Sequence, residues 1–145
     1  RGYPREINWT PSKNGFELTA WHDGYCRVRG MPRHHRSVIW QDGGFLKITD
    51  RVRTARPVQC HSYLHLHPDC RFESQAENNV LISYPAGHFR ISFSGPGELS
   101  CTDGLYHPEF YTEQMNIVLV YSWTASPNRN EDVVAIEVMP CESSF

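Results

Sequence analysis

Apolar and polar residues alternate along most of this 145-residue chain, which is the pattern of strands that bury one face. Residues 88–93, His-Phe-Arg-Ile-Ser-Phe, alternate without interruption, and residues 15–21 alternate in the same way. Apolar stripes at helical spacing are missing from every stretch of ten or more residues that is free of Gly and Pro. The pattern therefore predicts an all-β protein.

Turn residues divide the chain into short segments. Further strands are expected at 6–9, 26–29, 33–40, 45–53, 60–67, 71–74, 80–84, 115–123 and 132–138. The turn Gln41-Asp42-Gly43-Gly44 predicts a hairpin, because glycine accepts the positive φ of tight hairpin turns. Residues 95–104 are interpreted as turn-rich, and residues 105–111 as an aromatic loop. Ten to twelve short strands predict one antiparallel β-sandwich domain over residues 1–145.

Charge and cysteine content exclude several classes of protein. The formal net charge is −2, and no basic stripe indicates a nucleic-acid partner. No apolar run approaches the roughly 18 residues of a membrane span. Five cysteines without C-x-x-C spacing argue against a structural zinc knot and against a complete disulfide set, although up to two disulfides are compatible with the count.

A histidine-rich strand is expected within residues 60–69. If it is extended, one face carries four ring side chains, His61, Tyr63, His65 and His67. The opposite face is mostly apolar. His61, His65 and His67 can be interpreted as ligands of a divalent metal such as zinc. Imidazole and phenol groups also suit contacts with sugars. A solvated outer face, or histidines packed between sheets, is the plain structural alternative.

Two further groups are candidates for binding an acidic substrate. His22 and Tyr25 flank a turn, where His can neutralise a carboxylate and Tyr can act as a base, although the turn can equally be structural. His34, His35 and Arg36 form a compact basic cluster suited to carboxylate or sulfate. The alternative for Arg36 is a cross-strand ion pair with an acid such as Asp50.

Residues 85–88, Pro-Ala-Gly-His, combined with the earlier His-x-His, suggest a second class of protein. Cupins join similar patterns, but the spacing here differs from theirs. A cupin-like, metal-dependent small β-barrel enzyme, or a stand-alone carbohydrate-binding module, is therefore kept as the alternative function.

Three motifs in order carry a resemblance to a family. They are His22-Asp23-Gly24-Tyr25, then His35-Arg36-Ser37-Val38 with Asp42-Gly43 and Ile48-Thr49-Asp50-Arg51-Val52, and finally His65-Leu66-His67-Pro68. Together they resemble the C-terminal sheet domain of the heparinase II/III-like polysaccharide lyases. Residues 106–111, Tyr-His-Pro-Glu-Phe-Tyr, look like an aromatic loop near the end of such proteins.

The resemblance implies a longer parent protein, with an N-terminal α/α toroid that contacts this β-sandwich, and the start at Arg1 rather than Met favours the same interpretation. The implied activity is β-elimination on an acidic, uronic-acid-containing polysaccharide, and the implied location is periplasmic or extracellular. The family's catalytic and metal-binding residues lie mostly upstream of these motifs, so no catalytic residue is assigned. His22, Tyr25, His35 and Arg36 are the candidate substrate-binding residues, and the fragment alone is expected to be inactive.

Overall fold

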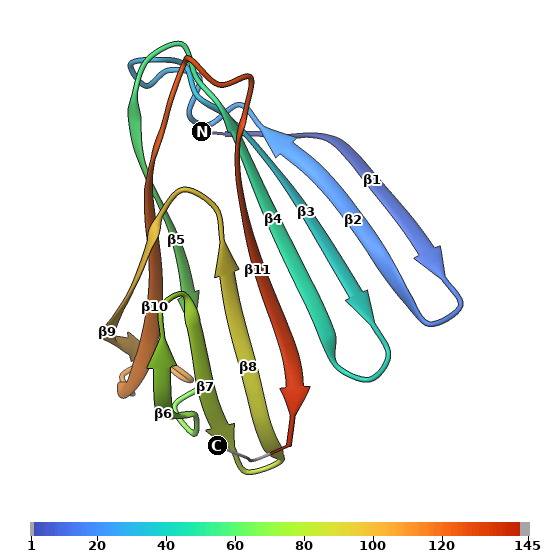
Figure 1. Ribbon diagram of the computed structural model, residues 1–145, viewed down its shortest axis with the longest axis vertical. Helices are drawn as coiled ribbons and strands as arrows, with labels where there is room; N and C mark the ends of the chain where they lie inside the picture. The colour runs from blue at the N-terminus through green and yellow to red at the C-terminus, as the bar shows by residue number, and fades with distance from the viewer. Residues whose placement is uncertain (1, 143–145) are drawn as a thin grey trace.

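The computed structural model describes residues 2–142, in which no helix is formed (Figure 1). Every pair of adjacent strands is antiparallel. The eleven strands are β1 (Pro4–Ser12), β2 (Gly15–His22), β3 (Arg33–Gln41), β4 (Phe45–Arg53), β5 (Val58–His65), β6 (Arg71–Ala76), β7 (Asn79–Tyr84), β8 (Gly87–Ser94), β9 (Glu98–Tyr106), β10 (Gln114–Ala125) and β11 (Asp132–Cys141).

The strands form two sheets that pack face to face. The long sheet has the order β1-β2-β3-β4-β11-β8-β7-β6, and the short sheet has the order β5-β10-β9. The prediction of an antiparallel β-sandwich is thus confirmed. The main buried side chains come from β4, β7, β8 and β11 of the long sheet and from β10 of the short one: Val52, Val80, Ile82, Ile91, Phe93, Leu119, Tyr121, Trp123, Ala125, Val134 and Ile136.

The short sheet covers only part of the long one. Strands β1, β2 and β3 contribute no residue to the buried apolar cluster, and every residue of β1 is exposed. In Figure 1 these three strands extend away from β5, β9 and β10. The boundary between the covered and uncovered parts of the long sheet is where the candidate site described below is formed.

The hairpin predicted around residues 41–44 joins β3 to β4. The two strands pair from Arg33 with Arg53 to Gln41 with Phe45. Gly43 and Gly44 adopt φ values of 91° and 87°, a region that glycine enters without a steric cost. The hairpin prediction is therefore confirmed, and its register fixes which side chains of β3 and β4 face each other.

The strand predicted at residues 26–29 is not formed. The backbone there makes successive four-residue turns, in which Cys26 N–H donates to Asp23 O and Val28 N–H donates to Tyr25 O. Four alternating residues between Gly24 and Gly30 are too few to determine a strand, and these local hydrogen bonds replace strand pairing. The prediction was wrong because the turn residues around this segment determine its backbone conformation more strongly than four alternating residues do.

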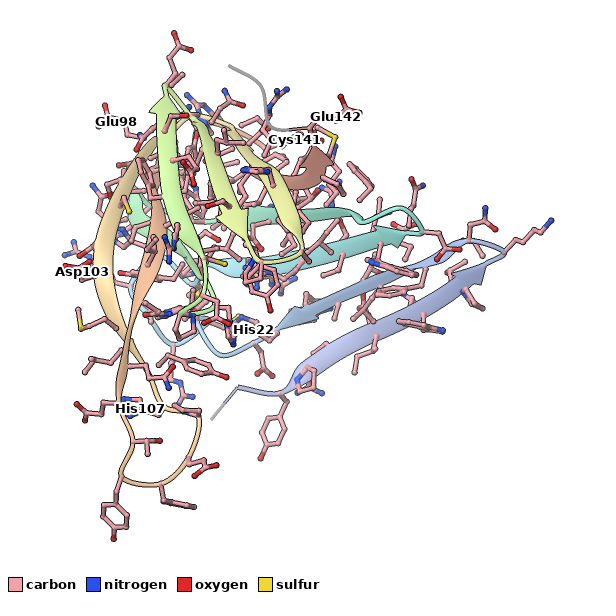
Figure 2. The ribbon with its side chains drawn as sticks, turned by 90° about the horizontal axis from the view of Figure 1, so that it is seen from below. His22, Glu98, Asp103, His107, Cys141 and Glu142 are labelled. Atoms are coloured by element: carbon pink, nitrogen blue, oxygen red, sulfur yellow. The ribbon has the colours of Figure 1, made fainter. Side chains whose placement is uncertain are left out.

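Within the segment predicted to be turn-rich, residues 95–97 form a bend, but the rest belongs to strand β9. It pairs with β10 from Glu98 to Tyr106. A Cβ atom on Gly104 would lie 2.5 Å from Val118 Cγ2, and one on Gly97 would lie 2.5 Å from the carbonyl oxygen of Ser122. Gly104 lies within β9 and allows close packing against β10, which the sequence alone did not distinguish from a turn, whereas Gly97 lies in the bend before β9. The loop after β9, which contains His107, projects from the short sheet (Figure 2).

The two faces of β5 are arranged as predicted. Ser62 is buried, and Leu64 packs at the core, whereas His61, Tyr63 and His65 are exposed. Strand β5 ends at His65, so His67 lies beyond it. All five cysteines are free thiols. Within residues 2–142, no helix is long and apolar enough to cross a membrane.

A buried tyrosine stabilises the turn that connects β8 of the long sheet to β9 of the short sheet. Tyr121 on β10 is fully buried and stacks on Phe93 of β8, with ring centroids 5.4 Å apart. Its hydroxyl donates to Gly95 O and accepts from Gly97 N–H, each at 3.0 Å. One hydroxyl thus satisfies two backbone groups of the β8–β9 turn.

Replacing Tyr121 with Phe should lower the free energy of unfolding by about 1–3 kcal/mol, because it leaves two backbone groups without their partner. Urea unfolding measures the change. Tyr63→Phe is the matched control, since Tyr63 is 60% exposed and its hydroxyl makes no hydrogen bond within residues 2–142. A Tyr121→Phe variant as stable as the control would contradict this role.

Candidate functional site

A cleft of about 780 Å³ lies between the β2–β3 region of the long sheet and strand β5 of the short sheet. The long sheet lines it with His22, His34 and Arg36, and β5 lines it with His61 and Tyr63. In Figure 2, His22 lies at the end of β2, between the short sheet and the free strands of the long one. Imidazole, guanidinium and phenol groups therefore meet along an otherwise largely apolar cleft.

A buried carboxylate organises the polar side of the cleft. Asp50 on β4 is only 2% exposed. Arg36, its register partner on β3, donates to it from Nε at 2.7 Å and from Nη2 at 2.8 Å. His34 Nε2 lies 2.7 Å from Oδ1, and the Ser62 hydroxyl donates to Oδ2 at 3.3 Å. The carboxylate is thus held by side chains from both sheets.

These contacts decide the charge of Asp50. Burial alone would raise its pKa, but the hydrogen bonds from His34 and Arg36, together with the positive charge of Arg36, lower it to about 2. The same pairing raises the pKa of the Arg36 guanidinium. Asp50 and Arg36 therefore form a charged pair at neutral pH, as the cross-strand alternative anticipated.

A directed chain of hydrogen bonds runs from the backbone to Asp50. The Gly24 N–H donates to His22 Nδ1 at 3.2 Å, so this nitrogen is an acceptor. His22 Nε2 lies 3.2 Å from His34 Nδ1. Since His34 must donate to Asp50 through Nε2, each imidazole keeps its proton on Nε2 and accepts at Nδ1.

The electrostatics favour a neutral His22. Burial and the neighbouring His34 both lower the pKa of His22. A proton added to His34 Nδ1 would reverse its bond to His22 and set a His22 N–H against the N–H of Gly24. The chain is therefore satisfied only while both rings are neutral.

The loop after β2 places Tyr25 at the mouth of the cleft. Its ring meets the His22 ring edge-on at 4.8 Å, and the residue is 51% exposed. Asp23 holds this loop, because it accepts from Tyr3 N–H at 2.8 Å and from the Arg5 guanidinium at 2.9 Å. Asp23 is thus a structural anchor, whereas Tyr25 presents its phenol to solvent.

Three of the four predicted substrate-binding residues line this cleft: His22, Tyr25 and Arg36. His35 does not, because adjacent residues of a strand point to opposite faces. It stacks on Trp21 on the other face of the long sheet, with ring centroids 5.7 Å apart. His34, which belongs to the same predicted basic cluster but was not chosen as a substrate-binding residue, lines the cleft instead. Strand parity with Arg36 was the sequence signal that favoured His34 over His35.

The three histidines interpreted as metal ligands are not brought together. His61 Nδ1 is 2.8 Å from the Ser122 hydroxyl, and His65 is the exposed last residue of β5. His67 contacts Tyr84 and Tyr106 beyond the end of that strand. Across residues 2–142, no three His, Cys, Asp or Glu side chains are grouped to hold a metal ion. The arrangement of these residues does not fit a zinc site.

Comparisons with known proteins identify one matching family model and several solved structures with the same fold. The family model described as "Heparinase II/III-like, C-terminal" matches residues 4–135. A solved heparinase III gene product superimposes with a TM-score of 0.76 at 13% identity, over 99% of this chain and 22% of that one. A heparan sulfate lyase from Pedobacter heparinus gives 0.78 at 16% identity, over 97% and 22%.

A 4-alpha-glucanotransferase from Thermococcus litoralis also shares the fold, with a TM-score of 0.60 at 13% identity over 94% of this chain and 23% of that one. No curated protein sequence matches the chain. At these identities the superpositions show a common fold. The chain spans about a fifth of the length of each of the solved lyases.

The lowered pKa of Asp50 predicts how stability depends on pH. Its folded-state pKa of about 2 lies below the unfolded value, so the ionised group contributes stability at higher pH. About 2 kcal/mol of stability should be lost as the pH falls from about 4 to about 2. Urea unfolding across this range, compared with Asp50→Asn, measures the effect. An equally steep loss in Asp50→Asn would show that other carboxylates cause it.

Proposed function

The chain belongs to the heparinase II/III-like C-terminal family, and on that premise we propose that it is the C-terminal sheet domain of a polysaccharide lyase. Its role is to form a wall of the substrate cleft and to contact an acidic, uronic-acid-containing polysaccharide. The observation that carries the proposal is the cleft itself, in which a fixed guanidinium, three imidazoles and two exposed phenols converge.

Arg36 is the group suited to a substrate carboxylate. Asp50 occupies its Nε and Nη2, whereas Nη1 makes no hydrogen bond within residues 2–142. The side chain is 47% exposed along the cleft. Because Asp50 fixes the plane of the guanidinium, the remaining N–H groups are held in place before substrate arrives. Tyr25 offers a ring and a hydroxyl to a neighbouring sugar.

The network around Asp50 is unsuited to proton abstraction. Both nitrogens of His22 and both nitrogens of His34 are engaged in hydrogen bonds, and the pKa of Asp50 is about 2. A general base needs a free acceptor with a pKa near the working pH. In β-elimination at a uronate, these residues therefore position and neutralise substrate, and the rest of the parent protein supplies the acid and base.

The proposal includes the partners and location that family membership suggests. The parent carries an N-terminal helical domain against which this sandwich completes the cleft, and it acts in the periplasm or outside the cell. The cupin-like alternative is not favoured, since the fold has two separate sheets and residues 2–142 hold no metal-ligand group. A stand-alone binding module is not favoured because the matching family is a C-terminal one.

The isolated chain should fold and bind uronate oligosaccharides without cleaving them. Tyr25→Ala should weaken binding of a heparan sulfate tetrasaccharide about fivefold to tenfold, because it removes the aromatic contact at the cleft mouth. Calorimetry measures the affinity. Tyr111→Ala is the control, since Tyr111 is fully exposed in the loop after β9.

Activity is read from the absorbance of the unsaturated product with heparin, heparan sulfate or alginate. Robust turnover by the isolated chain would refute the proposal that the rest of the parent protein supplies the catalytic acid and base. Equal tetrasaccharide affinity in the Tyr25→Ala and wild-type chains would show that Tyr25 does not contribute to binding.

A further inference from the structure

A second group of charged and aromatic residues lies on the face of the long sheet opposite the cleft. We call it the basic face, and its members are Trp21 on β2, Arg33 and His35 on β3, and Arg51 and Arg53 on β4. Three register pairs connect them: Trp21 with His35, His35 with Arg51, and Arg33 with Arg53. Side chains alternate along each strand, so these residues point away from His22, His34 and Arg36.

Trp21 organises the basic face. The Arg33 guanidinium lies 5.4 Å from the centroid of the indole ring, and the His35 ring stacks with the same indole at 5.7 Å. A cation over an aromatic face is favourable, and stacking restricts the freedom of both side chains. Two basic groups are thus held beside one half-buried ring.

Arg33 and Arg53 face each other as like charges. They are direct register partners, and neither makes an ion pair with a carboxylate within residues 2–142. Like charges opposite each other on neighbouring strands destabilise a sheet. Arg51 has a partner in Glu131, but that pair is 3.5 Å long and exposed on both sides. The uncompensated charge is a feature that a bound anion would stabilise.

The neighbouring loops add to this charge. Ala55 N–H donates to Gly30 O at 2.9 Å, which brings the loops that carry Arg29 and Arg56 together. Residues 25–56 contain eight Lys and Arg but only two Asp, although the whole chain has a net charge of −2. Positive charge is therefore concentrated at this end of the long sheet, and the rest of the chain is acidic.

We propose that the basic face is a second binding site for acidic polysaccharide, separate from the cleft and on the other side of the same sheet. This inference rests on the proposed function for its choice of ligand. Arg33 and Arg53 bind sulfate or carboxylate groups, for which guanidinium is the preferred partner, and Trp21 packs against the sugar ring between them. A long chain can then be held outside the cleft while another segment occupies it.

The test is binding of the 145-residue chain to immobilised heparin. Arg33→Gln/Arg53→Gln should weaken binding about tenfold, because two charge-assisted contacts are lost. The salt dependence should become shallower, since fewer counterions are displaced. Arg71→Gln/Arg90→Gln is the matched control: it removes two exposed arginines from the far strands β6 and β8, and should stay within about twofold of wild type.

Stability separates this effect from misfolding. Removing the repulsion between Arg33 and Arg53 should leave the urea midpoint unchanged or raise it. A lost affinity in a variant that is as stable as wild type supports the site. Unchanged heparin affinity in that variant would overturn the second site and leave the cleft proposal intact.

Two further arms distinguish the possible outcomes. If Tyr25→Ala leaves tetrasaccharide binding unchanged while Arg33→Gln/Arg53→Gln loses heparin, the cleft proposal fails and the second site stands. Alginate, which carries carboxylates without sulfates, shows which anion is preferred, and binding of either polymer through these arginines supports the site. Displacement of heparin by double-stranded DNA of equal charge, as efficiently as by heparin itself, would overturn the assignment to polysaccharide.

Discussion

The burial of one carboxylate is the constraint from which the candidate site follows. An ionised Asp50 in the interior is tolerated only with several well-placed donors, and the fold supplies them from β3 and β5. Meeting that requirement fixes Arg36 and His34. His34 orients the His22 ring through a hydrogen bond. The His22 ring also accepts from the Gly24 N–H, in the loop that carries Tyr25. The shape and charge of the cleft are thus consequences of satisfying a buried anion.

The alternation of side chains along β3 divides the chemistry of the long sheet between two faces. His34 and Arg36 face the cleft, where Asp50 neutralises Arg36. Arg33 and His35 face outwards beside Trp21, where positive charge is left uncompensated. Because the short sheet covers only part of one face of the long sheet, the inner face of β2 and β3 is accessible as well as the outer face.

Sequence reasoning succeeded where a short-range pattern determines the structure. Alternation on β5 assigned Ser62 and His61 to opposite faces, and the Gly43-Gly44 turn indicated the β3–β4 hairpin. It failed where a residue has two possible uses. Gly104 was assigned to a turn, but its role is to let β9 approach Val118 on β10. That contact joins residues far apart in the chain and leaves no local signal.

The candidate site shows the same division. His22, Tyr25 and Arg36 were predicted from residue type and local spacing, and the structure places all three along the cleft. His35 was included with them because it is a neighbour of Arg36 in sequence, although a strand sends such neighbours to opposite faces. The bond between His22 and His34 depends on the β2–β3 register, which follows from pairing the whole hairpin rather than from either histidine.

The most direct test of this account is NMR spectroscopy of the labelled ring nitrogens of His22 and His34 at neutral pH, which identifies the nitrogen that carries each proton. The account predicts neutral rings with the proton on Nε2 in both residues, because the chain runs from Gly24 to an ionised Asp50. A proton on Nδ1 of His34, or a charged His22, would contradict it.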